Sequence, residues 1–170
     1  MKQRKAKELF VFEEGKEKLL MLKLEQYCAY TERCTADVLK KCREWKVPQE
    51  MMEQLLSELR ENNFLNDERY GEAFARGKFR LKGWGKNKIK AALQTKSVQQ
   101  ETISSALQDI DATEYFRKLD ILMQKKNLLL KETDPFKRRT KLFQYAAQKG
   151  YEAGLILQWL DEQIKDKGTD

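Results

Sequence analysis

The stretch KNKIKAALQTKSVQQETISSALQ, residues 86–108, holds the pattern that decides the fold. Its apolar side chains recur at the three- and four-residue spacing of a helix face, first before and then after a short gap. They belong to Ile89, Leu93, Val98, Ile103, Ala106 and Leu107. The gap between Leu93 and Val98 leaves room only for a tight connection. The stretch therefore predicts a helix-turn-helix hairpin with Val98, Ile103 and Leu107 buried between its helices.

The same apolar pattern occurs three times in the chain. It returns when the sequence is laid on itself with shifts of 51 and then 53 residues. The first copy consists of Val38, Cys42, Val47, Met52, Leu55 and Leu56, and the third of Leu142, Ala146, Tyr151, Ile156, Trp159 and Leu160. All eighteen positions are apolar although only 41% of the chain is hydrophobic. We interpret the pattern as an internal repeat.

Capping and breaking residues predict where the helices begin and end. Start signals occur at Pro48, at Asn66-Asp67-Glu68, at Asp111 with Glu114, and at Asp134 with Pro135, and stop signals at Asn62, at Gly83 with Gly85, and at Gly150. A further helix is expected before each hairpin, at residues 16–30, 66–81 and 113–126. Leu9–Phe12 is β-like but too short to build a sheet. About nine helices result.

Three helices are the smallest number that closes a core, and such units gain stability by stacking on their neighbours. The sequence therefore predicts an all-α fold of three tandem three-helix repeats, each a helix plus a helix-turn-helix, in an elongated, curved array. We expect an N-terminal extension at residues 1–15, repeat 1 at 16–65, a basic repeat 2 at 66–110, and repeat 3 with the C-terminal tail at 111–170.

Composition limits the location of the protein and its redox state. The 36% of charged residues exceeds the ~25% of typical domains, which favours a body with much surface. No segment resembles a signal peptide, and no window approaches ~18 consecutive apolar residues. We therefore expect a cytoplasmic protein without membrane contact. Cys28, Cys34 and Cys42 are odd in number and have no metal-ligand spacing, which predicts reduced, structural thiols.

The chain has no histidine, which removes the commonest general base and the commonest zinc ligand. No GxxxxGK[ST] phosphate loop is present. The adjacent acids Asp67 and Glu68 are the nearest candidates for a magnesium site. Neighbouring residues on a helix do not face one another, however, and acids at a helix start are explained by the helix dipole. We expect no catalytic residue, no metal and no cofactor, and hence a protein that is not an enzyme.

One stretch holds the excess positive charge. No acid occurs from Ala73 to Gln100, whereas the whole chain carries a net charge of +7. The eight cations of the stretch are Arg76, Lys78, Arg80, Lys82, Lys86, Lys88, Lys90 and Lys96. Trp84 lies between two glycines in its middle and could stack on a base or fill a partner's pocket. Like charges at helical spacing repel, which favours an acidic or polyanionic partner over a merely solvated face.

A second basic cluster, Lys137, Arg138, Arg139 and Lys141, lies at the matching hairpin of the third copy. Lys141 aligns there with Lys88 of the second copy. The binding footprint could therefore continue along the array.

The residues from Asn66 to Arg76, NDERYGEAFAR, resemble the D-D-x-R-[FY]-A-x-x-[FY]-x-x-x-[RK] helix of the RecX family. Lys82–Ile89, KGWGKNKI, is similar to the family's G-x-x-[KR]-I loop and hairpin. Phe64-Leu65 and Glu32–Leu39 resemble two further family segments, with Cys34 or Thr35 where serine is usual and Asp37 in place of glutamate. The resemblance covers roughly Leu20 to Ile164 and is strongest from Phe64 to Leu107.

The resemblance implies tandem three-helix repeats and an activity exerted by binding. RecX-like proteins act in homologous recombination, DNA repair and the SOS response: they lie in the groove of the RecA–DNA filament and restrain ATP hydrolysis, strand exchange and filament growth. It implies a modulator of RecA, most simply an inhibitor, that is monomeric and binds single- or double-stranded DNA weakly. The expected contact residues are Arg69, Arg76, Lys78, Arg80, Lys82, Trp84, Lys86, Lys88 and Lys90.

The main alternative is a free-standing DNA-binding helical protein without sequence specificity, since basic helical hairpins also bind DNA grooves. The second helix of the basic hairpin, residues 99–108, has no basic residue, whereas a recognition helix supplies the cations that reach base edges. Sequence-specific readout is therefore not expected.

Overall fold

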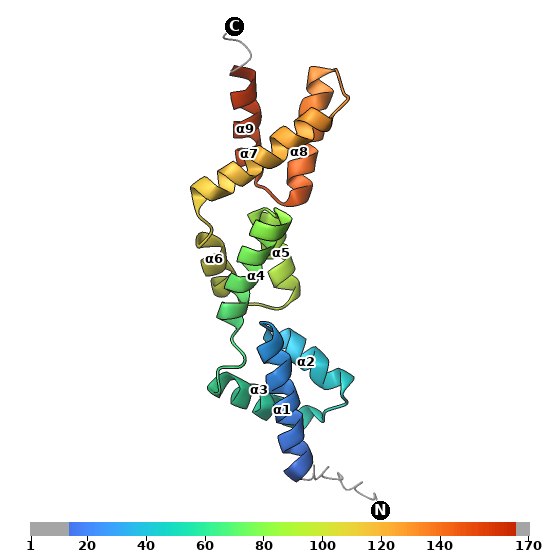
Figure 1. Cartoon of the computed structure of the whole chain (residues 1–170), viewed down its shortest axis with the longest axis vertical. Helices are drawn as coiled ribbons and strands as arrows, with labels where there is room; N and C mark the ends of the chain where they lie inside the picture. Colours follow the sequence, from blue (N-terminus) through green and yellow to red (C-terminus); the bar gives the residue numbers. More distant parts are fainter. Residues whose placement is uncertain (1–13, 166–170) are drawn as a thin grey trace, which may run out of the picture. The chain divides into compact units, whose positions relative to one another are not determined.

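The computed structural model describes residues 14–165, with side chains described for residues 15–163. Within this part all regular secondary structure is helical (Figure 1), which confirms the all-α prediction. The β-like Leu9–Phe12 lies outside the described residues. The nine helices of the described part are α1 (Glu14–Tyr30), α2 (Thr35–Glu44), α3 (Gln49–Glu61), α4 (Asp67–Lys82), α5 (Lys86–Thr95), α6 (Gln100–Gln108), α7 (Ala112–Leu129), α8 (Pro135–Lys149) and α9 (Ala153–Lys165).

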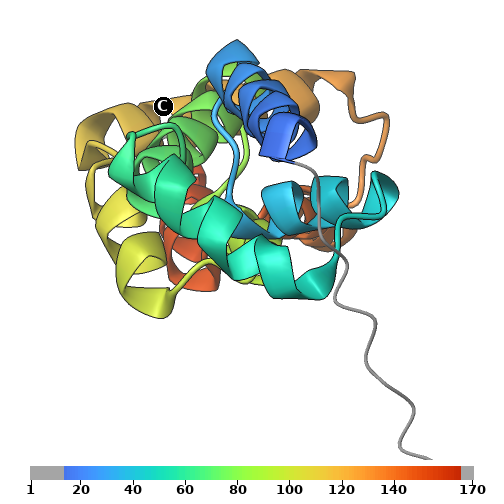
Figure 2. The same cartoon turned by 90° about the horizontal axis from the view of Figure 1, so that it is seen from below.

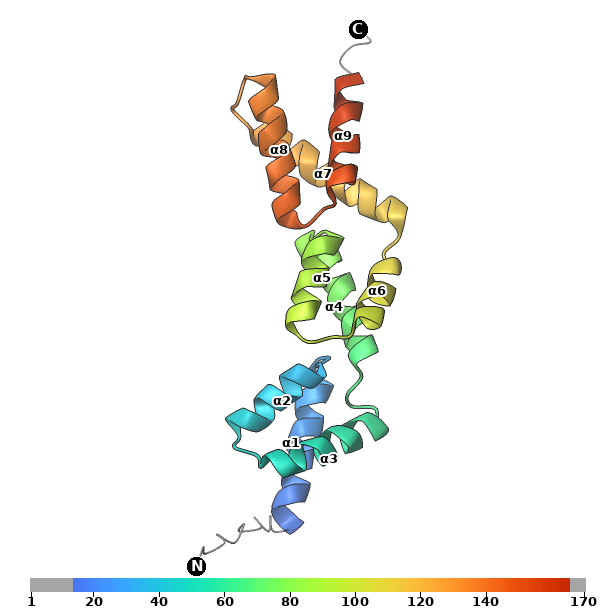
Figure 3. The ribbon, with the colours of Figure 1, turned by 180° about the vertical axis from the view of Figure 1, so that it is seen from behind.

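The helices group in threes, as the sequence predicts. Each repeat has one longer helix followed by a hairpin of two, namely α2–α3, α5–α6 or α8–α9 (Figure 3). The chain forms two compact units, one ending at Asp67 and the other beginning at Glu68. Repeat 1 therefore lies in the first unit, and repeats 2 and 3 share the second. No helix within residues 14–165 is both long and apolar enough to cross a bilayer.

The three hairpins turn in the same way. At each turn one residue has a left-handed backbone: Lys46 (φ 57°), Ser97 (φ 57°) and Gly150 (φ 93°). The next residue donates its backbone N–H to the carbonyl oxygen five residues back, at 2.9 Å for Val47, 3.2 Å for Val98 and 3.1 Å for Tyr151. This is the Schellman arrangement that ends a helix. The turns occupy equivalent places in the 51- and 53-residue register, so the repeat is present in the backbone as well as in the apolar pattern.

The repeated apolar positions form the cores. Sixteen of the eighteen are buried, and Met52 and Leu107 are half-buried. The prediction that Leu107 is buried was therefore wrong. Gly71 of α4 lets α6 approach so closely that a Cβ atom there would lie 3.1 Å from Thr102 Cγ2 and 3.8 Å from Ala106 Cβ. The buried face of α6 is thus centred near Ala106, and Leu107 is turned away by about 100°.

Repeat 1 shows how one unit is filled. In Figure 2, α1 lies across from the α2–α3 hairpin. All three helices contribute to one core, which contains Leu20, Leu24, Cys28, Val38, Cys42, Val47, Leu55, Leu56, Leu59 and Leu65. Cys28, Cys34 and Cys42 are buried cysteines outside disulfides, in agreement with the prediction of reduced, structural thiols.

Candidate partner-binding surface

The predicted contact residues lie on α4, on the loop at residues 83–85 and on α5, all in repeat 2. They do not form one face. Arg69, Arg76 and Arg80 are seven and four residues apart and lie on one side of α4. Lys78 and Lys82 project from the other side, towards the loop. The cations of α4 therefore point to two different sides of this helix.

Trp84 is the centre of one group of these residues. The Nζ atom of Lys78 lies 5.1 Å from the centroid of the indole ring, and that of Lys88 lies 4.8 Å from it. Lys78 Nζ also lies 5.0 Å from the ring of Phe74, one helical turn earlier. Contacts between cations and rings contribute ~0.5–1 kcal/mol each at exposed sites. We call Phe74, Lys78, Trp84 and Lys88 the Trp84 cluster.

The backbone of the loop places Trp84 in this cluster. Gly83 has φ 62°, and the Trp84 N–H donates to the Lys78 carbonyl oxygen at 3.2 Å. This bond ends α4 and folds the indole back over the last turn of the helix. Glycine adopts this left-handed backbone without the strain that other residues would incur.

Lys86 does not belong to the free surface. It is half-buried, and its Nζ atom lies 5.1 Å from the centroid of the Tyr115 ring in repeat 3. Its backbone N–H donates to Tyr115 Oη at 2.8 Å, and the Tyr115 hydroxyl donates to Glu152 Oε2 at 2.6 Å. Burial, and then the bond to Glu152, raise the pKa of Tyr115 far above its usual value. The hydroxyl therefore stays protonated and joins α5 to the start of α9.

Gly85 and Gly150 bring the start of α5 in repeat 2 into contact with the α8–α9 turn of repeat 3. The Gly85 N–H donates to the Lys149 carbonyl oxygen at 2.8 Å, and the Asn87 N–H to the Gly150 carbonyl oxygen at 3.0 Å. A Cβ atom on Gly85 would lie 2.3 Å from the backbone of Gly150. The glycine of the G-x-x-[KR]-I motif is therefore needed for close packing of the two repeats.

Aromatic rings continue this junction inside the unit. The ring of Tyr115 lies 5.7 Å from that of Phe79 and 5.0 Å from that of Tyr151, centroid to centroid. Burial raises the pKa of Tyr151 to about 12. The rings come from α4, α7 and the α8–α9 turn, so the junction is both apolar and hydrogen-bonded.

The other cations differ in their surroundings. Arg80 Nη2 lies 3.7 Å from Glu114 Oε2, and the Arg80 carbonyl oxygen accepts from Lys118 Nζ at 3.2 Å. The pair is exposed, so it contributes little to stability. Arg69 is half-buried. Of the predicted contact residues, Arg76, Lys82 and Lys90 are exposed and make no hydrogen bond, ion pair or ring contact with other described residues.

The structure thus brings Lys78, Trp84 and Lys88 together, and separates Lys86 and Arg80 from them. Sequence reasoning missed Phe74 and Tyr115. Phe74 could have been found, because it lies four residues before Lys78 and shares its helix face. Tyr115 lies 29 residues from Lys86, and no local pattern connects the two.

The second basic cluster is mostly engaged within repeat 3. Arg138 donates from Nη1 to the Glu132 carbonyl oxygen of the α7–α8 loop at 2.8 Å and from Nε to the side-chain oxygen Oδ1 of Asn127 in α7 at 2.7 Å. Arg139 pairs with Asp161, and Lys141 with Glu132, each at 2.7 Å. This geometry gives no support to a footprint that continues through these three residues.

Asp67 has a structural use. Its carboxylate accepts the Thr35 backbone N–H at 2.8 Å and the Thr35 hydroxyl at 2.5 Å. Cys34, at the N-cap of α2, makes no capping hydrogen bond with its side chain, and its Sγ atom donates to Asp37 Oδ2 at 3.2 Å. Asp67, the first residue of α4, therefore satisfies the start of α2 in place of the usual capping serine. Both of its oxygens are engaged, which leaves little room for the magnesium role.

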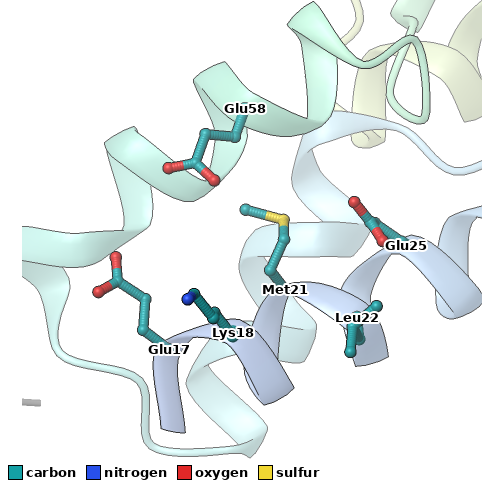
Figure 4. A pocket seen from close by; sticks show the side chains of 6 residues that line it. All are labelled: Glu17, Lys18, Met21, Leu22, Glu25 and Glu58. Atoms are coloured by element: carbon teal, nitrogen blue, oxygen red, sulfur yellow. The ribbon is translucent and has the colours of Figure 1, made fainter. Parts of the chain in front are cut away.

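Three carboxylates line a groove of about 540 Å³ between α1 and α3 (Figure 4). Gln54 Nε2 donates to Glu17 Oε1 at 3.2 Å and to Glu58 Oε1 at 3.0 Å. In the picture Met21 lies between Glu58 and Glu25, the third acid of the lining. Among the described residues, no group of three or more Cys, Asp or Glu is placed to hold a metal ion.

The sequence and the fold are similar to those of known proteins. The second three-helix domain of RecX matches residues 66–107, and the third matches residues 113–160. The chain is 40% identical over 95 residues to a regulatory protein RecX from Clostridium perfringens, in a match that covers 55% of this chain and 44% of that protein. It is 27% identical over 140 residues to the regulatory protein RecX of Streptomyces lividans, covering 82% and 73% of the two chains.

Solved structures agree in fold. The crystal structure of RecX from Lactobacillus salivarius superposes with a TM-score of 0.75 at 20% identity, covering 84% of this chain and 92% of that one. A second crystal structure, of a regulatory protein RecX, gives the same score and identity and covers 95% of this chain. At this identity the likeness shows the fold alone, and it confirms the tandem three-helix repeats.

Proposed function

This chain belongs to the RecX family of regulatory proteins, and on this premise we propose that it inhibits the RecA recombinase. It binds in the groove of the RecA–DNA filament and restrains ATP hydrolysis, strand exchange and filament growth. It acts by binding, without catalysis of its own, in the cytoplasm where the filament forms. Its contact with bare DNA is weak.

The observation that carries this proposal is the Trp84 cluster. Lys78 and Lys88 are held beside one indole ring, so their side chains lose less conformational freedom on binding than free lysines would. The junction with repeat 3 fixes α5 beneath them through Gly85 and Lys86. A fixed cationic surface with an aromatic centre suits a phosphate backbone or an acidic protein face. Repeated units could engage successive protomers, and each added contact gains from effective concentration.

The test reverses two charges of the cluster. Lys78→Glu with Lys88→Glu should leave the helical content intact, because Lys78 is half-buried, Lys88 is exposed, and the one hydrogen bond lost, from Lys88 Nζ to the Gln148 carbonyl oxygen at 3.3 Å, is exposed as well. The concentration needed for half-inhibition of RecA-dependent ATP hydrolysis should rise at least about tenfold, the effect of losing ~1.4 kcal/mol of binding. Lys86 is left unchanged, because it packs against Tyr115 and its reversal would disturb the junction.

The matched control is Lys23→Glu with Lys40→Glu, which makes the same charge change at exposed positions of repeat 1. It should inhibit as the parent protein does. Equal loss in both double variants would mean that only net charge matters, and the Trp84 cluster would have to be abandoned as the site.

Free-standing binding to single-stranded DNA is the second candidate, and the position of Trp84 between two cations favours it. Bases stack on aromatic rings with ~1–3 kcal/mol per base. If about five phosphates are engaged, the affinity should fall with salt with a log-log slope near −3.5. Tight binding to bare strands that Trp84→Ala abolishes would support this function, whereas tight binding to filaments alone would support the regulator.

A further inference from the structure

Repeat 3 has an uncovered apolar surface. Leu128 is 86% exposed, Leu129 71% and Phe136 78%. Beside them is a cavity of about 710 Å³ between the start of α8 and the end of α9, with Leu142, Trp159 and Leu160 among its lining residues. In Figures 1 and 3 the two helices diverge from their turn towards this end. We call Leu128, Leu129, Phe136 and the cavity the repeat 3 edge.

The repeat register indicates which kind of neighbour would pack against the repeat 3 edge, because the equivalent position of repeat 2 is covered. A shift of 53 residues relates Arg138 and Arg139, which line the cavity, to Gly85 and Lys86 of repeat 2. Repeat 3 covers that earlier position: the backbone of Gly150 lies against Gly85, and the Tyr115 hydroxyl accepts the Lys86 N–H. Within residues 14–163 no element covers the corresponding position of repeat 3 in this way.

The part of repeat 3 that covers repeat 2 contributes carboxylates and aromatic rings. Glu114 lies beside Arg80, Tyr115 lies against Lys86, and Glu152 accepts a hydrogen bond from the Tyr115 hydroxyl. The repeat 3 edge has charges that suit the same kind of partner. Residues 125–141 include seven cations and two acids. Lys131 and Lys137 are exposed near the cavity, and Arg139 is paired only with Asp161, whose side chain is 60% exposed.

The edge is also preformed. Arg138 donates to the backbone carbonyl oxygens of Asn127, Leu130 and Glu132, which fixes the α7–α8 loop. Asp134, the residue directly before α8, accepts the Lys137 N–H at 2.9 Å and so caps the helix. A partner would therefore meet a fixed groove rather than a loop that must first be ordered, which lowers the cost of binding.

We propose that the repeat 3 edge is a docking site for an amphipathic α-helix of another protein, with apolar or aromatic residues on one face and carboxylates beside them. The apolar face enters between α8 and α9 next to Phe136, and the carboxylates reach Lys131, Lys137 and Arg139. An open groove between two helices, with apolar residues continuing outside it, fits a helix. This docking is separate from the Trp84 cluster and does not depend on it.

The experiment uses the full chain and a designed probe. The probe is a fluorescent helical peptide of ~18 residues with leucine and phenylalanine at i, i+4 and i+7 and glutamates on either side. Its counterpart has lysines in place of the glutamates. Fluorescence anisotropy should show the acidic peptide binding at least about tenfold more tightly than the lysine peptide, since the rim repels the latter.

Variants of the protein locate the site. Phe136→Asp should weaken binding of the acidic peptide at least about tenfold, whereas Phe136→Leu should retain it. Leu81→Asp is the matched control, because Leu81 is 83% exposed but lies on α4 of repeat 2. Circular dichroism checks that each variant keeps its helices.

Three results would overturn the proposal. The first is equal binding of the two peptides or binding of neither, and the second is a loss in Leu81→Asp as large as in Phe136→Asp. The third is self-association of the parent protein in sedimentation that Phe136→Asp abolishes, because the occupant would then be a second copy of this chain. Loss of peptide binding without loss of RecA inhibition would separate this site from the Trp84 cluster.

Discussion

At Gly150 the absence of a side chain decides how closely repeat 3 approaches repeat 2. The residue has φ 93°, and a Cβ atom there would lie 2.3 Å from Lys88 Cβ and 2.6 Å from the Lys88 backbone nitrogen. Gly150→Ala should lower the free energy of unfolding by about 2 kcal/mol or more, because the left-handed backbone alone costs ~1–2 kcal/mol and the backbone of α5 must also move. Urea unfolding followed by circular dichroism measures the change.

The control makes the same substitution where nothing opposes it. Gly77 lies inside α4, and a Cβ atom there would meet no atom within 4 Å. Gly77→Ala should raise the stability by ~0.5–1 kcal/mol, because alanine loses less entropy in a helix. If both variants shift stability in the same direction, the close packing at Gly150 is not what limits the substitution.

At the scale of the helix, the first helices of the hairpins are capped in two ways. Asp134, the residue directly before α8, caps that helix, whereas the start of α2 depends on Asp67, 32 residues away in the sequence. Asp134→Ala should cost ~1 kcal/mol, the usual value of a cap. Asp67→Ala should cost more, ~1.5–3 kcal/mol for each bond to the charged group that is not replaced by water. Thermal unfolding of the two variants tests the order.

The prediction for Asp67 also separates structure from catalysis. If Asp67 is structural, Asp67→Ala should lower the free energy of unfolding and the helical order of α2. The variant should show the same rate of ATP or DNA hydrolysis as the parent protein. An Asp67→Ala variant as stable as the parent would contradict the capping role.

At the scale of the molecule, repeats 2 and 3 should open as one cooperative unit, because Tyr115, Gly85 and Gly150 join them. Tyr115→Phe keeps the ring but removes two hydrogen bonds, each contributing ~0.5–1.5 kcal/mol. Amide hydrogen exchange should therefore become faster both in α5 and around Glu152, and stay unchanged in α1–α3. Faster exchange confined to α7 would show that the junction does not couple the two repeats.

The fold could be predicted from local signals and the site only in part. The apolar register locates every hairpin, and Asp111 and Asp134 mark helix starts because capping depends on residues three apart. Partners across repeats have no such signature. Nothing near Lys86 indicates that Tyr115 covers it, or that Gly85 meets a turn 65 residues later. Sequence therefore identified the basic stretch correctly as a set of charges but could not tell which of them remain free.

The three left-handed turn residues have a consequence for the order of the modules. Lys46 and Ser97 carry side chains at the place where Gly150 has none, and only the third turn fits against Gly85. The repeats are therefore alike in architecture but not interchangeable. A gene rearranged so that the second module follows the third would encode the same hairpins, yet the Ser97 turn would then face Arg138, which stands in the third module where Gly85 stands in the second. The order of the second and third modules therefore depends on the missing side chain of Gly150, and it could not be changed without losing this packing.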